Sequence, residues 1–426
     1  MKSCLDGMDG ALTDARNPRQ ATMISVEEAL KLILEKVPTR PSELVPLEAL
    51  TGRVLAEEIS SDLDSPPHDK SMVDGYAVQR NDLAELPVTL GVLEEVTAGE
   101  VPRSAVQPGQ ATRIMTGAPV PSGADAVVMV EQTSTSSDAD GIEWVTIGEV
   151  HLPDSGNIMP QGTSLRAGDV VLKPGRTIRP LEIGLLAEVG RHQVQVSEIP
   201  SVAVLSTGNE LVDVNQSPQP GQIRNSNGPM LGALASRAGA KVVSLGIGRD
   251  RMEDLRQAIS QGLQEDVLVL SGGVSAGVLD LVPQVLQELG VEQVFHKVAI
   301  KPGKPLWFGV ATTGQTLVFG LPGNPVSSMV CFELFVRPAL QAVAGGKPTG
   351  LEQTEATLHT PFHKRASRPT FFPSRLYLEN NQTRVQPLPW KGSADQRTLT
   401  DANCLAYFPA DQNQYDAGDT ILVYRL

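Results

Sequence analysis

Aromatic residues, cysteines and long apolar runs are all scarce in this chain of 426 residues. Only 4% of the residues are Phe, Trp or Tyr, so the cores are expected to pack mainly aliphatic side chains. Cys4, Cys331 and Cys404 lie far apart and form no metal-ligand or disulfide pattern, which fits a reducing cytoplasm. No apolar run approaches about 18 residues, and residues 1–22 contain no apolar signal core. Neither a membrane span nor a secretory signal is therefore expected.

Positive charge is also in deficit, because 35 Lys and Arg face 49 Asp and Glu and leave a formal net charge of −14. This balance argues against general attraction to nucleic acid or to an anionic membrane. An anionic ligand would instead depend on a local group of cations. The hydrophobic share of 41% is typical of a globular protein, and the length predicts about two to four domains.

The patterning changes several times along the chain. Ser25 and Glu28 form a capping pattern before a helical apolar repeat. From Tyr76 to Val150, short alternating runs broken by Gly and Pro predict a small antiparallel β domain, with TSTSSDADG as an exposed hairpin tip. The segments before and after this stretch resemble each other in composition, which favours one domain with an insertion.

Residues 200–340 alternate apolar strands with helical stretches. The strands VAVLST, KVVSLGI, DVLVL and LVFG predict a parallel sheet covered by helices on both faces. Ligands bind such sheets at the carboxyl ends of the strands, so the loops STGNE, SGGVSAG and LPGNP are expected to face one crevice. The remaining residues predict a small all-β domain. The predicted division is a loose extension at 1–23, a discontinuous domain at 24–66 and 152–198, an inserted β domain at 67–151, an α/β domain at 199–345 and a β domain at 346–426.

Two of these loops frame a candidate anion site. In SGGVSAG the glycines allow close backbone approach, and Ser271 and Ser275 can donate hydrogen bonds to a ligand oxygen. In LPGNPVSS, Asn324 is a good N-cap, Pro325 fits the first helical position and the serines add hydroxyls. Lys301 and Lys304 lie between the two loops in the proline-braced turn KPGKP. The pattern predicts a pocket for a substrate with several negative groups.

Each feature also has a simpler interpretation. LPGNP can be no more than a well-made helix start, and the two lysines can be surface residues. Asp250 can cap a helix through the box Asp250-Arg251-Met252-Glu253, and Asp280 can do the same. With Glu210 they lie at predicted strand ends or helix starts, where they could instead converge on Mg²⁺. Asp74 can be a solvated acid in a turn, and Thr116 can be a turn hydroxyl.

The ordered set of motifs resembles the MoeA family of molybdopterin molybdenumtransferases, which is related to the E domain of gephyrin. The matching segments run in order from about residue 24 to the C-terminus: PPHDKSMVDGYAV, RIMTGAPVPSGADAVVMVEQ, NIMPQGTSLRAGDVVLKPG, LSTGNEL, GQIRNSNG, SGGVSAGVLD, KVAIKPGKPLWFG, GLPGNPVSS and GSADQRTLTDANCLAYFP. Each segment alone is weak evidence, but their common order is specific. The resemblance implies an elongated cytoplasmic homodimer whose chains combine a discontinuous domain, an inserted β module, an α/β domain like that of molybdopterin adenylyltransferases and a C-terminal β barrel.

The same resemblance implies a reaction and a set of residues. Adenylylated molybdopterin and molybdate would be the substrates, AMP would be released with the help of Mg²⁺, and the site would lie between two subunits. The implied catalytic residues are Asp74, Thr116, Glu210, Asp250 and Asp280, with Glu210, Asp250 and Asp280 as metal ligands. The implied substrate-binding residues are Thr207, Gly208, Ser271, Gly272, Gly273, Ser275, Lys301, Lys304, Pro322, Asn324, Pro325, Ser327, Arg375 and Ser393. Of these, the loops STGNE and SGGVSAG would bind the pterin phosphate and the adenylate, and Lys301, Lys304 and the LPGNPVSS helix start would bind molybdate. Adenylyltransferase and molybdoenzyme maturation proteins are conceivable partners, whereas nucleic acid and membrane are not expected.

Some positions depart from the family pattern. His68 stands where an aromatic residue is common, Lys70 where Asn is frequent, and Asn225 where Asp is frequent. Ser164 replaces a carboxylate, so it is not assigned a role. A scaffold protein on the same fold and a tungstate-inserting paralogue remain as alternatives, but the chain has no fused adenylyltransferase domain and keeps the acids at 74, 210, 250 and 280.

Overall fold

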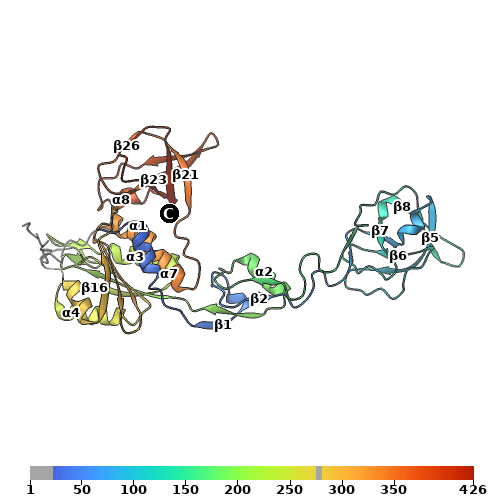
Figure 1. Ribbon diagram of the computed structural model, residues 1–426, viewed down its shortest axis with the longest axis horizontal. Helices are drawn as coiled ribbons and strands as arrows, with labels where there is room; N and C mark the ends of the chain where they lie inside the picture. The colour runs from blue at the N-terminus through green and yellow to red at the C-terminus, as the bar shows by residue number, and fades with distance from the viewer. Residues whose placement is uncertain (1–22, 275–280) are drawn as a thin grey trace, which may run out of the picture.

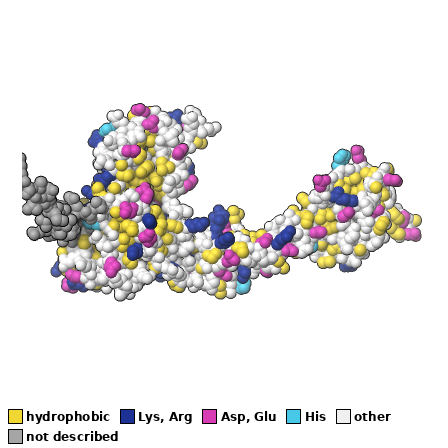
Figure 2. Space-filling view, in the orientation of Figure 1, with side chains coloured by type: hydrophobic (Ala, Val, Ile, Leu, Met, Phe, Trp, Pro, Cys, Tyr) yellow, Lys and Arg dark blue, Asp and Glu magenta, His cyan; other side chains and the backbone are white. Residues whose placement is uncertain are grey.

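The computed structural model describes residues 23–274 and 281–426 of an elongated molecule (Figure 1). An α/β domain and a β barrel lie together at one end, and a separate β sheet lies at the other. A narrow middle segment containing β1 and α2 joins the two ends. Acidic side chains are scattered along the visible face, whereas the densest group of Lys and Arg lies over the middle segment (Figure 2).

The α/β domain is built on a six-stranded sheet in the order β16-β13-β17-β20-β19-β18. The first four strands are parallel, and they are the four that the sequence predicts. Two antiparallel strands, which the sequence analysis did not predict, extend the sheet at the β20 edge. The strands are β13 (Ser201–Thr207), β16 (Lys241–Gly248), β17 (Val267–Ser271), β18 (Val291–His296), β19 (Trp307–Ala311) and β20 (Leu317–Leu321).

Helices cover both faces of this sheet, which confirms the predicted three-layer αβα fold. One core unites α1, α3 and the helical stretch after β20 with the sheet, and the other unites α4 and α5 with the opposite face. The Ser25 hydroxyl accepts a hydrogen bond from the Glu28 N–H, so the predicted cap of α1 is confirmed. The helices are α1 (Val26–Leu34), α3 (Asn227–Arg237), α4 (Met252–Gly262), α5 (Leu281–Glu288), α6 (Pro325–Cys331) and α7 (Arg337–Val343).

A π-helical turn, Phe332–Val336, joins α6 to α7. Its Glu333 is fully buried and pairs with Arg237 at the end of α3 and with Arg337. Two guanidinium groups compensate the desolvation of this carboxylate, and the network ties α3 to α6 and α7. The helical stretch Pro325–Val343 is long and apolar enough to cross a membrane. However, 83% of its most apolar part is buried inside the protein.

The remote sheet has the order β7-β4-β6-β5-β9-β8. All its strand pairs are antiparallel except β5 and β6, which are parallel. The predicted antiparallel β domain is therefore confirmed apart from this one pair. Residues 133–137 form a strand with mostly exposed side chains, so the predicted hairpin tip is confined to the turn that follows. The strands are β4 (Gly75–Val78), β5 (Val88–Val96), β6 (Gln110–Ile114), β7 (Ala126–Met129), β8 (Thr133–Ser137) and β9 (Glu143–Ile147).

The middle segment combines residues that precede and follow the remote sheet in the chain. Strand β1 (Ser42–Pro46) pairs with β12 (Gln193–Ser197), and β2 (Ile59–Ser60) pairs with β11 (Val170–Leu172). Together with α2 (Pro180–Glu188) they enclose one aliphatic core that includes Leu55, Ile59 and Val194. The chain therefore leaves this segment, builds the remote sheet and returns to it.

The C-terminal residues form a closed barrel in the order β21-β24-β23-β25-β27, as the resemblance implied. Few aromatic residues are present in the chain, but they concentrate here: Phe408 stacks on Phe362 and contacts Tyr415. The strands are β21 (Gln353–Leu358), β23 (Thr370–Glu379), β24 (Gln382–Pro387), β25 (Cys404–Phe408) and β27 (Thr420–Arg425).

Candidate functional site

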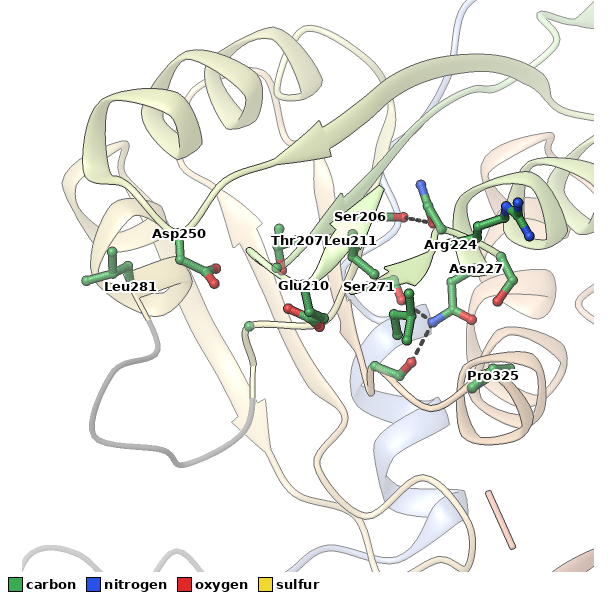
Figure 3. Close-up of a pocket in the computed structure, with 17 residues that line it drawn as sticks. Ser206, Thr207, Glu210, Leu211, Arg224, Asn227, Asp250, Ser271, Leu281 and Pro325 are labelled. Atoms are coloured by element: carbon green, nitrogen blue, oxygen red, sulfur yellow. Dashed lines mark hydrogen bonds between the residues drawn. The ribbon is translucent and has the colours of Figure 1, made fainter. Parts of the chain in front are cut away.

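Three loops at the carboxyl ends of β13, β17 and β20 enclose a cavity of about 360 Å³, named the loop cavity (Figure 3). The prediction that STGNE, SGGVSAG and LPGNP face one crevice is confirmed for the described residues of these loops. The predicted site residues that line the cavity are Thr207, Gly208, Glu210, Asp250, Ser271, Gly272, Gly273 and Pro325. Ser275 and Asp280 lie outside the described residues.

Glycine is required where the β17 loop folds against the end of β13. Gly272 and Gly273 have φ values of 94° and 65°, which disfavour other side chains. A Cβ atom on Gly272 would lie 2.6 Å from the Thr207 carbonyl oxygen, and one on Gly273 would lie 2.8 Å from Thr207 Oγ1. The two glycines thus let the backbone of one loop line the cavity beside Thr207.

Two carboxylates, Glu210 and Asp250, face the loop cavity from different elements (Figure 3). Glu210 follows β13, and its carboxylate oxygen would lie 2.4 Å from a Cβ atom on Gly208. Asp250 follows β16; its Oδ2 accepts from the Asn209 N–H, and its own N–H donates to Asn209 Oδ1, both at 3.1 Å. The capping interpretation of Asp250 is wrong, because Arg251 is the N-cap of α4 and makes no side-chain cap bond. Asp250 instead braces the loop that carries Glu210.

Asn225 and Asn227 also line the loop cavity, at the start of α3. Asn225 Oδ1 accepts from Ser206 Oγ at 2.9 Å and from the Gly228 N–H at 3.0 Å. A carboxylate oxygen could accept the same two bonds, so an amide at this position keeps the start of α3 intact. It removes one negative charge from the cavity relative to an aspartate.

A divalent cation fits the chemistry of this cavity. Mg²⁺ in phosphate sites is commonly held by one or two carboxylates together with phosphate oxygens and water. Glu210 and Asp250 supply two carboxylates beside a loop suited to phosphate. Within residues 23–274 and 281–426, no three His, Cys, Asp or Glu side chains form a metal-binding group, so a complete protein-only ligand set is absent from the described part.

Lys301 and Lys304 line a different cavity of about 590 Å³, named the basic cavity. It lies between the KPGKP turn and the C-terminal barrel. Its lining includes the cations Lys301, Lys304, Lys364, Arg365, Arg368 and Lys391, and no Asp or Glu is found among the described residues that line it. The buried indole N–H of Trp390 has no hydrogen-bond partner within the described chain. In a protein of net charge −14, this concentration of cations has the chemistry to hold an anion, although the Lys364 ammonium already donates to the Pro409 carbonyl.

The turn that carries the lysines is fixed by its backbone. The Lys301 N–H donates to the Pro369 carbonyl, and the Lys301 carbonyl accepts from the Phe371 N–H, both at 2.8 Å. A Cβ atom on Gly303 would lie 2.6 Å from Cys331 Sγ, so the turn packs directly on α6. Burial raises the pKa of the Cys331 thiol, which therefore acts as a packing group.

Arg368 is held at the same place. Its Nη1 donates to the Ile300 carbonyl at 2.8 Å, and burial lowers the pKa of its guanidinium from the ordinary value. Arginine remains protonated in proteins because its ordinary pKa is above about 12. Among the described residues the Arg368 guanidinium makes no second hydrogen bond, so its other N–H groups can donate to an anion.

The two cavities adjoin the same helix start. Pro325 lines the loop cavity, Ser327 lines the basic cavity, and the Val326 N–H between them donates to the Ser393 carbonyl at 3.1 Å. Asn324 is the N-cap of α6 but makes no side-chain cap bond, and Pro322 is buried just before it. Arg375 lies on β23 and lines neither cavity. The site residues predicted on the glycine loops and those predicted around Lys301 and Lys304 therefore line two neighbouring cavities.

Asp74 and Thr116 lie in the remote β domain, far along the molecule from both cavities (Figure 1). Asp74 Oδ1 accepts from the Thr116 N–H and from the Thr116 hydroxyl, both at 2.7 Å. These two bonds lower the pKa of Asp74, with the backbone bond first and the hydroxyl bond second. The structure thus pairs these predicted residues with each other but does not bring them to the other site residues of the same chain.

We expect Thr116→Val to raise the pKa of Asp74 towards its ordinary value of 3.8, because the variant loses one donor and keeps the N–H. Because the pKa of Asp74 is lowered in the folded state, the Asp74 bonds stabilise the loop more at high pH than at low pH. The stabilisation that these bonds give the loop is complete above the ordinary value and is lost as the pH falls through the lowered one. Carboxyl carbon chemical shifts followed between pH 2 and 6 (roughly the range around this value) measure the change. Thr116→Ser is the control, and equal titration of Asp74 in both variants would show that the hydroxyl bond has no effect.

A larger cavity, of about 970 Å³, lies elsewhere. It is lined by the start of α2 and by the turn after α7, with Lys173, Arg176, Arg179 and Lys347 as its cations. Arg176 and Arg179 both bind Glu182, which is nearly buried. None of the residues predicted for the site lies here.

Several residues that line the two cavities were not predicted from the sequence, namely Asn227 in the loop cavity and Lys364, Arg365, Arg368, Trp390 and Lys391 in the basic cavity. Arg368 approaches the basic cavity from a segment that folds next to residue 300, and no motif spacing indicates that contact. Asn227 was quoted within GQIRNSNG but received no role; its place at the start of a helix after a strand is the signal that could have identified it.

The fold and the two cavities define a class, namely an α/β ligand-binding domain joined to a barrel and to a remote β domain. Family profiles match in chain order: MoeA N-terminal region (domain I and II) at residues 24–190, a probable molybdopterin binding domain at 203–342, and MoeA C-terminal region (domain IV) at 355–426. The chain therefore belongs to the MoeA family, which confirms the resemblance found in the sequence.

Known relatives span the same length. Molybdopterin molybdenumtransferase of Staphylococcus aureus is 35% identical over 415 residues, covering 96% of each chain. The protein of that name from Staphylococcus epidermidis is 35% identical over 405 residues, covering 94% of this chain and 95% of the relative. A crystal structure of a molybdopterin biosynthesis MoeA protein from Pyrococcus horikoshii has a TM-score of 0.78 and 34% identity, covering 95% of this chain and 99% of that one.

Proposed function

We propose that this protein inserts molybdenum from molybdate into adenylylated molybdopterin and releases AMP. The observation that carries the proposal is the pair of adjoining cavities at α6. One combines glycine-rich loops with two carboxylates, and the other is lined by six Lys and Arg side chains. The relatives named molybdopterin molybdenumtransferase support molybdenum cofactor biosynthesis as the setting.

The loop cavity suits the phosphate-bearing substrate. The backbone at Gly272 and Gly273 allows close approach, and the Ser271 and Thr207 side chains add hydroxyl groups. Glu210 and Asp250 would hold Mg²⁺ against the phosphate oxygens. Bound there, the cation supplies neutralisation of the charge that develops on the departing AMP.

The basic cavity suits molybdate, a tetrahedral dianion. Lys301, Lys304 and Arg368 supply positive charge from two segments, and Ser327, Ser393 and Trp390 lie in the same lining. Charge-assisted hydrogen bonds of this kind are stronger than neutral ones and compensate the anion for lost water. Because α6 begins between the cavities, the oxyanion and the pterin would be bound next to each other.

We infer that a second copy of the chain completes the site. In this elongated arrangement the β domain that carries Asp74 and Thr116 lies too far along the molecule to join the loop cavity of its own chain, so a second copy would have to supply these residues. A mixture of Asp74→Ala and Glu210→Gln proteins, each inactive alone, should recover about a quarter of wild-type activity if copies assort at random in a twofold dimer. No recovery, with mixed dimers demonstrated by affinity tags, would place Asp74 outside the shared site.

The proposal is tested by incubating the protein with adenylylated molybdopterin, molybdate and Mg²⁺ and measuring AMP. Release that requires all three components supports it, and no release by folded protein contradicts it. Competition by tungstate in the same assay determines which oxyanion is preferred. We further infer a cytoplasmic location, since Cys331 and Cys404 are both buried free thiols.

A further inference from the structure

Asn227, the first residue of α3, connects three elements around the loop cavity (Figure 3). Its Nδ2 donates to Ser271 Oγ at the end of β17 and to the Gly323 carbonyl after β20, both at 2.7 Å. The Asn227 side chain is 8% exposed and Ser271 is 2% exposed, so water hardly competes for these bonds. The amide therefore fixes the relative positions of two loops that line the cavity.

The orientation of this amide follows from chemistry. A backbone carbonyl can only accept, so the atom of Asn227 that faces Gly323 must be the nitrogen. The same NH₂ group uses its second hydrogen on Ser271, which makes the Ser271 oxygen an acceptor in this bond. The hydroxyl proton of Ser271 must then point elsewhere, and no acceptor for it is found among the described residues.

Two other buried oxygen atoms that line the loop cavity also lack hydrogen-bond partners among the described residues. Thr207 Oγ1 and Asn227 Oδ1 are buried and have no hydrogen-bond partner within the described chain. Buried polar groups without partners are uncommon in folded proteins, and a catalytic role or a bound water or ion is among the explanations for them. Ser271, Thr207 and Asn227 all line the loop cavity, so a ligand there is positioned to meet these groups.

We propose that Asn227 is a positioning residue that directs the Ser271 hydroxyl proton into the loop cavity, towards an oxygen of the phosphate-bearing substrate. The identity of that substrate rests on the proposed function. The amide acts through Ser271: by occupying one lone pair of the oxygen, it removes orientations in which the hydroxyl would face Asn227. The far end of α3 is anchored through Arg237 and the buried Glu333, so Asn227 lies on a helix fixed at both ends.

The test is a double-mutant cycle on the binding of AMP, measured by calorimetry with the full-length protein. Asn227→Asp has the size of asparagine but lacks the NH₂ donor, so Ser271 would donate to the new carboxylate instead of to the ligand. We expect Asn227→Asp to weaken AMP binding at least about tenfold, the loss typical of one hydrogen bond to a charged group. Ser271→Ala should weaken it by a similar factor.

The double variant separates positioning from independent roles. If Asn227 acts through Ser271, combining the two changes should weaken binding little more than either change alone. Losses that multiply in the double variant, or AMP binding by Asn227→Asp within twofold of wild type, would overturn the proposal. Wild-type protein that binds no AMP would overturn it too.

Two further variants test whether the effect on AMP binding comes from loss of the Asn227 donor. Asn227→Ala removes the donor without adding charge and should show the same coupling if Asn227→Asp folds poorly, as judged by thermal unfolding. Asn403→Asp is the matched control, because Asn403 Nδ2 donates to the Leu376 carbonyl in the barrel, away from the cavity. It should bind AMP as wild type does. The predicted coupling in a protein that releases no AMP during turnover would contradict the proposed function while supporting the role of Asn227.

Discussion

Replacing Glu210 by glutamine is expected to lower molybdate-dependent AMP release by at least about a hundredfold, equivalent to roughly 2.7 kcal/mol of transition-state stabilisation. Glu210 is one of two carboxylates that face the loop cavity, and its charge is what a cation on the phosphate would need. Glutamine keeps the size of the side chain, so its packing against Gly208 is preserved. The loss should be smaller at high Mg²⁺ concentration if the effect lies in metal binding.

The control for this prediction is Asp213→Asn. Asp213 lies just beyond β14 (Leu211–Val212), three residues after Glu210, and does not line the loop cavity. The Asp213→Asn substitution removes one negative charge from the same segment. It should leave AMP release within about twofold of wild type, as surface changes usually do. Near-normal release by Glu210→Gln would remove this carboxylate from the mechanism.

The double change Lys301→Ala and Lys304→Ala is expected to raise the molybdate concentration needed for half-maximal rate by about a hundredfold. This corresponds to about tenfold per lysine on average, the typical loss for a hydrogen bond to a charged group. Lys301 should contribute more than Lys304, since it is half-buried whereas Lys304 is exposed. The fold should survive, because Lys301 is tied to residues 369 and 371 through its backbone.

The rate at saturating molybdate should change much less than the concentration required, because the lysines bind the oxyanion and do not touch the adenylate. Lys241→Ala is the control: Lys241 is an exposed cation at the start of β16 and lines neither cavity. An unchanged molybdate requirement in the double variant would place the oxyanion elsewhere. The next candidate would be the cavity lined by Lys173 and Lys347.

Local pattern was enough to predict much of the fold. Continuous apolar runs such as DVLVL are buried on both faces, and all four predicted parallel strands are present in one sheet. Strands β18 and β19 escaped prediction because they pair antiparallel at the sheet edge, where runs such as VEQVFH carry a mixed pattern. The exposed strand β8 escaped for a related reason, since its Ser and Thr side chains give no apolar alternation.

The site was predicted in part, and the reason for the rest is distance along the chain. Thr207 and Ser271 end two neighbouring strands of one parallel sheet and Pro325 follows the next, so topology alone brings them to one edge. The basic cavity instead joins residues near 300 and Ser327 to residues within 362–393 across two domains. Nothing in the spacing of those segments indicates that contact, so only the family resemblance separated the oxyanion site at Lys301 from the phosphate site on the glycine loops.

The most direct test of the account is a single-turnover experiment under anaerobic conditions, with adenylylated molybdopterin bound to the protein in the presence of Mg²⁺. Molybdate is then added, and AMP and pterin-bound molybdenum are measured from the same samples. The account predicts that both appear together, in equal amounts and only after molybdate is added. AMP that is released without transfer of molybdenum, or no AMP from folded protein, would contradict it.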